Sequence, residues 1–263
     1  MDDITAISKA KILMSDKIRI NKYLAECGLG SRRQCDEIIA AGRVSINGQK
    51  AEMGTQVGIG DKILLDRKEV QHISQKRYYL YNKPKGAVVS RIDENGRATI
   101  YDYLKDSGIE NIENLKYVGR LDLASEGALL LTNDGDLAFS LTHPRFQIKK
   151  VYFVKISREL TVAEMQKIVE NGVFSDGDIL RAGAIRFKSE DNGKFCYEVD
   201  LYEGKNRQVR RIFEALGESV IQLKRLQFAT IKLNDLASGK IRELSEKEID
   251  GLKNKIKKNE KNP

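Results

Sequence analysis

The chain has 263 residues, of which 41% are hydrophobic and 32% charged, a composition that allows one large or two modest globular domains. Its net charge of +8 favours a polyanionic partner, although solubility alone also accounts for such a charge. Three scattered cysteines and only two histidines exclude a disulfide framework, a zinc ribbon and a multi-histidine metal site, and no apolar run is long enough to span a membrane.

The first part of the chain predicts a short helical unit. Residues 1–16 match no motif, and we expect a disordered leader. Apolar residues at helical spacing predict a helix over residues 20–27. Ser31, followed three residues later by Gln34, is typical of a capping box, so a second helix is expected to begin at Arg32.

A small sheet is expected to follow these helices. Residues 44–46 alternate as a short strand, and Asn47-Gly48 is a strong hairpin signal. Residues 17–70 therefore predict a separate unit of two helices and a small sheet. The charged stretch over residues 71–77 is interpreted as a linker.

The larger part, residues 78–250, mixes hairpins with a few helices and lacks a regular strand–helix alternation. This pattern favours an α+β fold with a mixed, largely antiparallel sheet flanked by helices. Residues 251–263 predict a frayed basic tail. The expected elements are strands over residues 78–81, 128–132 and 151–156, a helix capped by Thr161 that ends near Glu170, and turns at Asp176-Gly177 and Asn192-Gly193.

Cations gather around the start of the second helix. Arg32 and Arg33 in its first turn oppose the helix dipole, at a cost of about 0.3–1 kcal/mol each. A phosphate at the free N–H groups of the helix end would resolve this conflict, and the alternative is that both side chains extend into water. Arg19, Lys22 and Arg43 nearby favour the phosphate.

The stretch from Arg19 to Gly48 resembles an S4 RNA-binding domain, and the resemblance covers about residues 18–70. It implies binding of structured RNA. The residues expected to contact RNA in this unit are Arg19, Lys22, Ser31, Arg32, Arg33 and Arg43.

Two further clusters lie in the larger part. The segment Val118-Gly-Arg-Leu-Asp122 places an aspartate on a loop before a buried strand, where it is either a functional carboxylate or a loop cap. In the segment from Glu203 to Gly217, apolar residues form one helical stripe, and Arg210 lies at its border. A border arginine can turn inward toward a carboxylate or phosphate, or remain solvated.

Taken together, these clusters resemble the pseudouridine synthases that carry an N-terminal S4 domain and modify ribosomal RNA. The resemblance runs in motif order over about residues 18–245. It implies that Asp122 is the catalytic aspartate, Tyr152 the active-site tyrosine, Arg210 the basic partner of the aspartate, and Leu223 the apolar residue beneath the target base.

The same resemblance implies that Arg120 props the RNA open where the target base was. We expect further phosphate contacts that position the RNA strand without reading its sequence. Two departures from the family pattern, at Ala124 and at the segment Phe228-Ala-Thr-Ile231, affect substrate contacts but not the four catalytic positions. The residues expected to contact phosphate here are Lys83, Lys85, Lys150, Arg207 and Arg211.

The implied reaction breaks the N1–C1′ bond of a uridine and rejoins the base through C5. It needs an ionised carboxylate but no cofactor, metal or redox change, and Asp122 either attacks carbon or acts as a base. The target must leave its stack, which costs a few kcal/mol. An arginine beside Asp122 would keep the carboxylate charged, and the Tyr152 hydroxyl can relay a proton.

Within this family we favour a uridine of 23S large-subunit RNA, with 16S small-subunit RNA as the alternative, and either free RNA or an assembly intermediate as substrate. We expect a cytoplasmic monomer. Two readings of other classes stay open: a non-catalytic S4-type RNA-binding or ribosome-assembly factor, and a hydrolase that uses Asp122 and Glu126 as a glycosidase pair.

Overall fold

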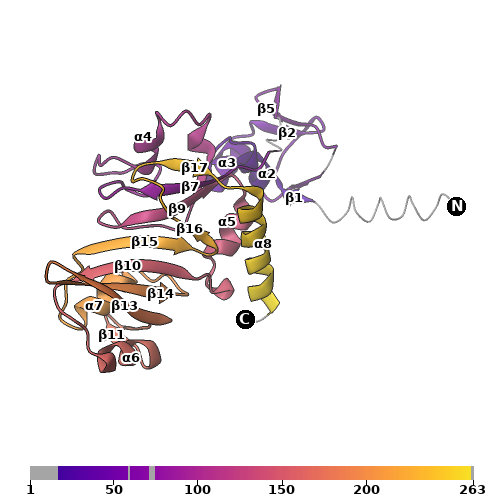
Figure 1. The fold of residues 1–263 in the computed structure, drawn as a ribbon. Helices are drawn as coiled ribbons and strands as arrows, with labels where there is room; N and C mark the ends of the chain where they lie inside the picture. Colours follow the sequence, from indigo (N-terminus) through magenta and orange to yellow (C-terminus); the bar gives the residue numbers. More distant parts are fainter. Residues whose placement is uncertain (1–16, 59, 71–74, 262–263) are drawn as a thin grey trace. The chain divides into compact units, whose positions relative to one another are not determined.

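The computed structural model describes residues 17–58, 60–70 and 75–261. The chain divides into two compact units, residues 1–76 and 77–263 (Figure 1). The expected leader, residues 1–16, and residues 71–74 of the expected linker lie outside the described residues.

The first unit contains the two predicted helices, α2 (Ile20–Glu26) and α3 (Arg32–Ala40). The predicted capping box is present: Ser31 accepts a hydrogen bond from the Gln34 backbone, and the Gln34 side chain accepts one from the Ser31 backbone. The apolar faces of both helices and of the short strands form one buried core. The strands are β1 (Ile18–Arg19), β2 (Val44–Ile46), β3 (Gln49–Lys50), β4 (Gln56–Val57), β5 (Ile63–Leu65) and β6 (Lys68–Glu69).

The second unit is built on a nine-stranded sheet, counted within the described residues, with the strand order β13-β14-β10-β15-β9-β7-β17 and with β16 and β8 attached to β15 and β9. Its pairings are antiparallel except for that of β15 with β9, so the predicted α+β fold with a mixed, largely antiparallel sheet is confirmed. The strands are β7 (Tyr78–Lys83), β8 (Lys116–Val118), β9 (Glu126–Thr132), β10 (Lys150–Ile156), β13 (Ala184–Asp191), β14 (Lys194–Leu201), β15 (Gln222–Phe228), β16 (Ile231–Lys232) and β17 (Ile241–Glu243), and β11 (Val173–Ser175) pairs with β12 (Asp178–Leu180) in a separate hairpin.

The parallel seam between β9 and β15 joins the two halves of the sheet. It consists of the pairs Lys224–Glu126 and Arg225–Gly127. Gly127 has φ +108°, and a Cβ added there would lie 2.3 Å from the Arg225 carbonyl oxygen. Only glycine therefore allows the two strands to approach this closely.

Each face of the sheet has its own core, because neighbouring residues of a strand point to opposite faces. Along β9, Leu129 and Leu131 belong to one core, and Ala128 and Leu130 to the other. The helices that cover the faces are α4 (Ile100–Leu104), α5 (Gly135–Thr142), α6 (Val162–Glu170), α7 (Gln208–Glu214) and α8 (Glu246–Lys261), with short 3-10 turns η1 (Ile112–Asn114) and η2 (Pro144–Phe146).

Two expectations for this unit are wrong. Residues 251–261 do not form a frayed tail, since α8 continues through them to Lys261, with Leu252 and Ile256 buried against the second core, and residues 262–263 lie outside the described residues. The first strand does not stop at Tyr81 but continues to Lys83, because its last residues pair with Ala128 and Gly127 of β9. No helix in the described part of the chain has the length and apolarity needed to cross a membrane.

Candidate active site

Asp122 lies on the loop between β8 and β9. Gly119 turns the chain with φ +69°, and the Ser125 backbone N–H donates to the Asp122 carbonyl at 3.0 Å, which closes a tight turn. The Gly86 N–H donates to the carbonyl of Leu123 at 2.8 Å. One hydrogen bond within the loop and one from the segment after β7 thus hold the loop in place.

Three buried cations donate to backbone carbonyls of this loop. Lys83 Nζ donates to the Ser125 carbonyl at 2.7 Å, and an Arg210 guanidinium nitrogen donates to the Ala124 carbonyl at 3.0 Å. Arg225 reaches the Arg120 carbonyl at 3.5 Å. Carbonyl groups fixed by charged donors are held more firmly than by neutral ones, so these contacts orient the Asp122 turn.

Arg210 turns inward from α7, as its border position predicts, and is 8% exposed. Its two terminal nitrogens donate to the carbonyls of Val220 and Ala124, both at 3.0 Å. Among the described residues, no hydrogen bond or ion pair joins its side chain to that of Asp122, so the pairing with the aspartate stays a prediction. Burial lowers the pKa of Arg210, and Asp122 opposes that shift through its charge. The charge of Asp122 therefore favours the protonated form of Arg210.

Tyr152 and Leu223 come from the neighbouring strands β10 and β15. Both are buried and belong to the same core, so their side chains lie on the same face of the sheet. A cavity of about 480 Å³ opens above them and is also lined by Asp122 and Ser125. This volume lies in the range of ligand sites for small organic molecules.

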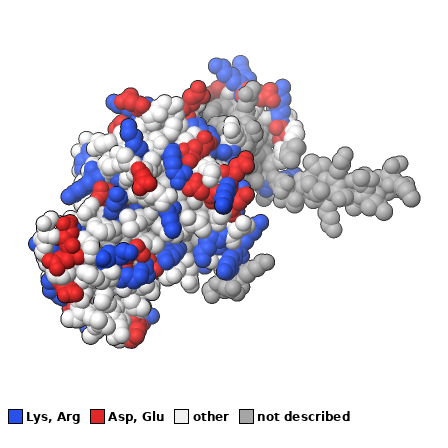
Figure 2. Space-filling model, viewed as in Figure 1, with Lys and Arg blue, Asp and Glu red and all other residues white. Residues whose placement is uncertain are grey.

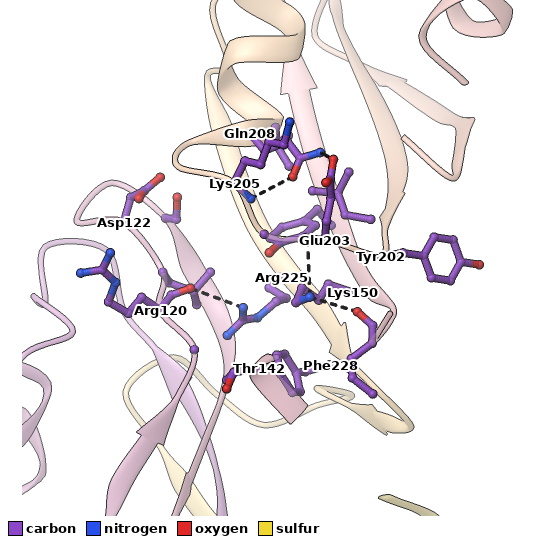
Figure 3. Close-up of a pocket in the computed structure, with 18 of the residues that line it drawn as sticks. Arg120, Asp122, Thr142, Lys150, Tyr202, Glu203, Lys205, Gln208, Arg225 and Phe228 are labelled. Carbon is purple, nitrogen blue, oxygen red and sulfur yellow. Dashed lines mark hydrogen bonds between the residues drawn. The ribbon is translucent and has the colours of Figure 1, made fainter. Parts of the chain in front are cut away.

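Cations and an aromatic ring form another wall of this cavity (Figure 3). The Arg225 guanidinium lies 4.9 Å from the centre of the Phe228 ring, and Lys150 Nζ lies 5.8 Å from it. Burial, with the charge of Arg225, lowers the pKa of Lys150 to about 8. Burial also lowers the pKa of Lys83, to about 8, with Asp122 opposing the shift. Both amines therefore lose their proton more easily than an exposed lysine does.

The loop between β14 and α7 contributes the remaining wall. The Gln208 amide donates to Glu203 at 2.6 Å, and its oxygen accepts from the Lys205 backbone at 3.1 Å. Arg207 has φ +48°, an uncommon conformation for a residue other than glycine, and lines the cavity with an exposed side chain. Figure 3 shows Tyr202 of the same segment pointing away from the other labelled residues.

The residues of the larger part that are predicted to contact phosphate are either accessible or buried. Arg120, Lys150 and Arg207 line the cavity, and Lys85 is exposed. The prediction is wrong for Lys83 and Arg211, whose charged groups are buried and already bound within the protein. Lys83 is fully buried beneath the Asp122 loop, and Arg211 is 8% exposed and binds Ser175, Asp176 and Asp178 of the β11–β12 hairpin.

In the first unit, Arg19, Arg32 and Arg33 are exposed. The Ser31 hydroxyl is used by the helix cap, and Arg43 forms an ion pair with Asp66. Lys22 lies 3.9 Å from Glu26 on the same helix. Arg32 and Arg33 are thus the cations best placed for phosphate at the start of α3.

Sequence reasoning missed several cavity residues. Arg225 could have been found, because it follows Leu223 by two residues and a strand places both on one face. Gln208 stands inside the segment already singled out around Arg210. His143 is one of two histidines but gave no spacing signal. Within the described residues, His, Cys, Asp and Glu side chains form no group of three that could hold a metal ion.

Comparisons with known proteins agree with the division of the chain into two units. The RNA pseudouridylate synthase family matches residues 77–215, and the S4 domain family matches residues 18–63. A solved structure described as a pseudouridylate synthase superposes with a TM-score of 0.62 at 27% identity, covering 89% of this chain and 99% of that one.

Two relatives, from Pseudomonas aeruginosa and Bacillus subtilis, are each named ribosomal large subunit pseudouridine synthase B and are each 35% identical to this chain. The matches cover 90% and 89% of this chain. The chain spans 95% of the Bacillus protein but only 62% of the Pseudomonas protein, which is longer. A relative from Xanthomonas campestris with the same name is 32% identical, and the match covers 93% of this chain but 51% of that protein. This chain therefore belongs to the RNA pseudouridylate synthase family, with an S4 domain preceding the synthase domain.

Proposed function

We propose that this protein converts a uridine of large-subunit ribosomal RNA to pseudouridine, with Asp122 as the catalytic carboxylate. The observation that carries the proposal is the cavity in which Asp122, Tyr152 and Leu223 meet from three separate segments of the chain. These are three of the four residues assigned to catalysis by their motifs. The fourth, Arg210, holds the backbone two residues after Asp122.

The cavity accepts a nucleoside that has swung out of its stack. Tyr152 packs against one face of the uracil and Leu223 against another part of the ring. Contacts of this kind return the few kcal/mol that unstacking costs. Arg120, exposed at the cavity wall, fills the space that the base leaves in the RNA.

The reaction exchanges one bond for another at C1′ of the ribose. The N1–C1′ bond breaks, the C5–C1′ bond forms, N1 gains a proton and C5 loses one. Asp122 supplies the carboxylate that acts on the nucleoside, and the Tyr152 hydroxyl relays the proton that leaves C5. The buried cations around the Asp122 loop fix this carboxylate before the substrate arrives, so little reorganisation is needed during the reaction.

Asp122→Asn tests the proposal. Because the side chain lies on a loop and makes no ion pair with Arg210, we expect the variant to fold and to bind RNA like the parent. We expect its turnover to fall by at least about a thousandfold, the upper range for loss of a catalytic acid or base. Turnover is followed as tritium release from a 23S transcript labelled at uridine C5. Retained turnover would remove Asp122 from the mechanism.

The choice of large-subunit RNA is supported by the names of the relatives. It is tested by carbodiimide mapping of both ribosomal RNAs from cells with and without the gene. One pseudouridine should disappear from 23S RNA and none from 16S RNA. A loss in 16S RNA would move the substrate to the small subunit, and no loss with no tritium release would leave a non-catalytic RNA-binding protein.

A further inference from the structure

A corner formed by the end of α5 and by η2 lies at the cavity rim. Thr142, His143 and Pro144 of this corner line the cavity. Phe139, one turn earlier on α5, is 53% exposed, although Leu137 and Leu141 of the same helix are buried. Phe139 therefore contributes little to the core.

The rings of this corner are arranged around one another. Phe139 and His143 have ring centres 5.0 Å apart, and the Arg145 guanidinium lies 5.9 Å from the Phe139 ring centre and 4.5 Å from that of Phe146. His143 Nδ1 accepts a hydrogen bond from the Arg145 backbone N–H at 3.3 Å, which fixes the imidazole. An exposed aromatic surface with a guanidinium beside it is thus held in place at the cavity rim.

Helix α8 fixes a row of lysines next to this corner. The Asn259 amide donates to the Phe146 carbonyl at 2.5 Å, which ties the end of α8 to η2. Lys257 and Lys258 on the same turn, and Lys253 one turn earlier, are exposed, and within the described residues they form no ion pair. On the face drawn in Figure 2, basic side chains gather over the lower half of α8.

We infer that this corner is a docking site for the RNA strand beside the target uridine, and the inference rests on the proposed function. The exposed rings of Phe139 and His143 stack the base that neighbours the target. Lys253, Lys257 and Lys258 hold the phosphates of the same strand. When a uridine swings out, the adjacent base loses a stacking partner, and an aromatic surface at the cavity rim replaces it.

The chemistry of the corner favours an unpaired RNA strand. A protein partner would use the apolar ring but has no use for three unpaired lysines in a row, whereas a duplex offers phosphates but no free base face. A single strand presents both a base and a phosphate at every nucleotide. The two parts of the site therefore match the two parts of one ligand.

The stacking half is tested in the Asp122→Asn background, so that no turnover interferes. The probe is a short single-stranded oligonucleotide in which uridine and 2-aminopurine alternate, because 2-aminopurine loses fluorescence when it stacks. Phe139→Ala should abolish most of the quenching and weaken binding by about tenfold, within the range for loss of one base–aromatic stack. Phe139→Tyr, which keeps the ring, should restore both. Phe174→Ala, which removes an even more exposed ring from the β11–β12 hairpin, is the control.

The phosphate half is tested by the salt dependence of binding to the same probe. Replacing Lys253, Lys257 and Lys258 together by Gln should reduce the slope of log affinity against log salt by about 2, since each contact with a single strand contributes about 0.7. The charge-matched control replaces Lys105, Lys188 and Lys240, which are exposed elsewhere on this unit. Equal slopes for the two triple variants would overturn the lysine assignment.

The failure of this inference is separable from failure of the proposed function. If the parent protein releases tritium from 23S transcript but Phe139→Ala quenches 2-aminopurine like Phe174→Ala, the corner is not a stacking site. If the parent protein releases no tritium yet Phe139→Ala loses quenching, the corner binds RNA in a protein that is not a synthase. In an active synthase, Phe139→Ala should raise KM and leave kcat within about twofold of the parent, because the bound target meets the same catalytic groups.

Discussion

Positive charge has different roles in the two units of this protein. In the first unit, Arg32 and Arg33 are exposed at the start of a helix, where water screens their charge. In the second, Lys83, Arg210 and Arg225 are buried and donate to backbone carbonyls of the Asp122 loop. Exposed cations provide affinity that depends on salt, whereas buried cations fix geometry and lie out of reach of salt.

Arg210→Met, which removes one of the buried cations, should have the largest effect of the substitutions that test this contrast. The variant leaves the carbonyls of Val220 and Ala124 without their donor inside the protein, and each such loss costs about 1–3 kcal/mol. We expect the free energy of unfolding to fall by about 2–6 kcal/mol and turnover to fall by at least about a hundredfold.

Chemical denaturation and tritium release measure the two effects of Arg210→Met. Arg210→Lys separates them, because a lysine keeps the charge but reaches only one of the two carbonyls. Arg97→Gln, which removes an exposed arginine paired with Asp93, is the control and should change neither quantity. Full turnover in Arg210→Met would show that the loop needs no buried cation.

Replacing Arg32 and Arg33 by Gln should have an intermediate effect. The double variant should lower the slope of log affinity against log salt by about 1.8 for a duplex region of RNA, with kcat and unfolding unchanged. Binding of 23S transcript over a salt series measures this. A lowered kcat at saturating RNA would contradict the division between affinity and geometry.

The pH dependence of RNA binding should show the smallest effect. Lys150 has a pKa of about 8 in the folded protein, below its usual value, so its charge is lost as pH rises through 8. We expect KM to rise a few-fold between about pH 7 and pH 9, and Lys150→Arg to abolish that rise because arginine stays charged.

Lys150 should also make the stability of the protein depend on pH. A rise in pH that weakens RNA binding should stabilise the fold. Between about pH 8 and the ordinary lysine pKa, the unfolded chain holds a proton on Lys150 that the folded chain does not. The free energy of unfolding should therefore increase with pH in this window. Lys83, with a pKa of about 8, contributes in the same direction. A decrease of stability with rising pH there would contradict both assignments.

Local patterns predicted the elements that depend on neighbouring residues. The capping box of Ser31, the helical stripe around Arg210 and the loop position of Asp122 are all found in the structure. These features are determined by residues within a few positions of one another. No local pattern indicates that Tyr152 and Leu223 lie close together. That expectation comes from the resemblance to the family, whose motifs occur in the same order.

The errors concern contacts between residues distant in sequence. Lys83 follows the predicted strand end and is expected to contact phosphate, but its amine binds the Ser125 carbonyl 42 residues later. Residues 251–261 appeared too polar to fold, yet Asn259 of α8 binds η2, 113 residues earlier. The burial of Leu252 and Ile256 depends on packing against residues far away in the sequence. It therefore cannot be predicted from the residues around them.

The seam at Gly127 has a consequence for biosynthesis. Arg225 binds the Ala128 carbonyl across 97 residues of sequence, and without β15 the Asp122 loop has neither Leu223 nor Arg225 beside it. During synthesis, Asp122 is added to the chain long before Leu223 and Arg225, which line the same cavity. Until β15 has left the exit tunnel, the nascent chain therefore lacks two of the residues that line the cavity around Asp122.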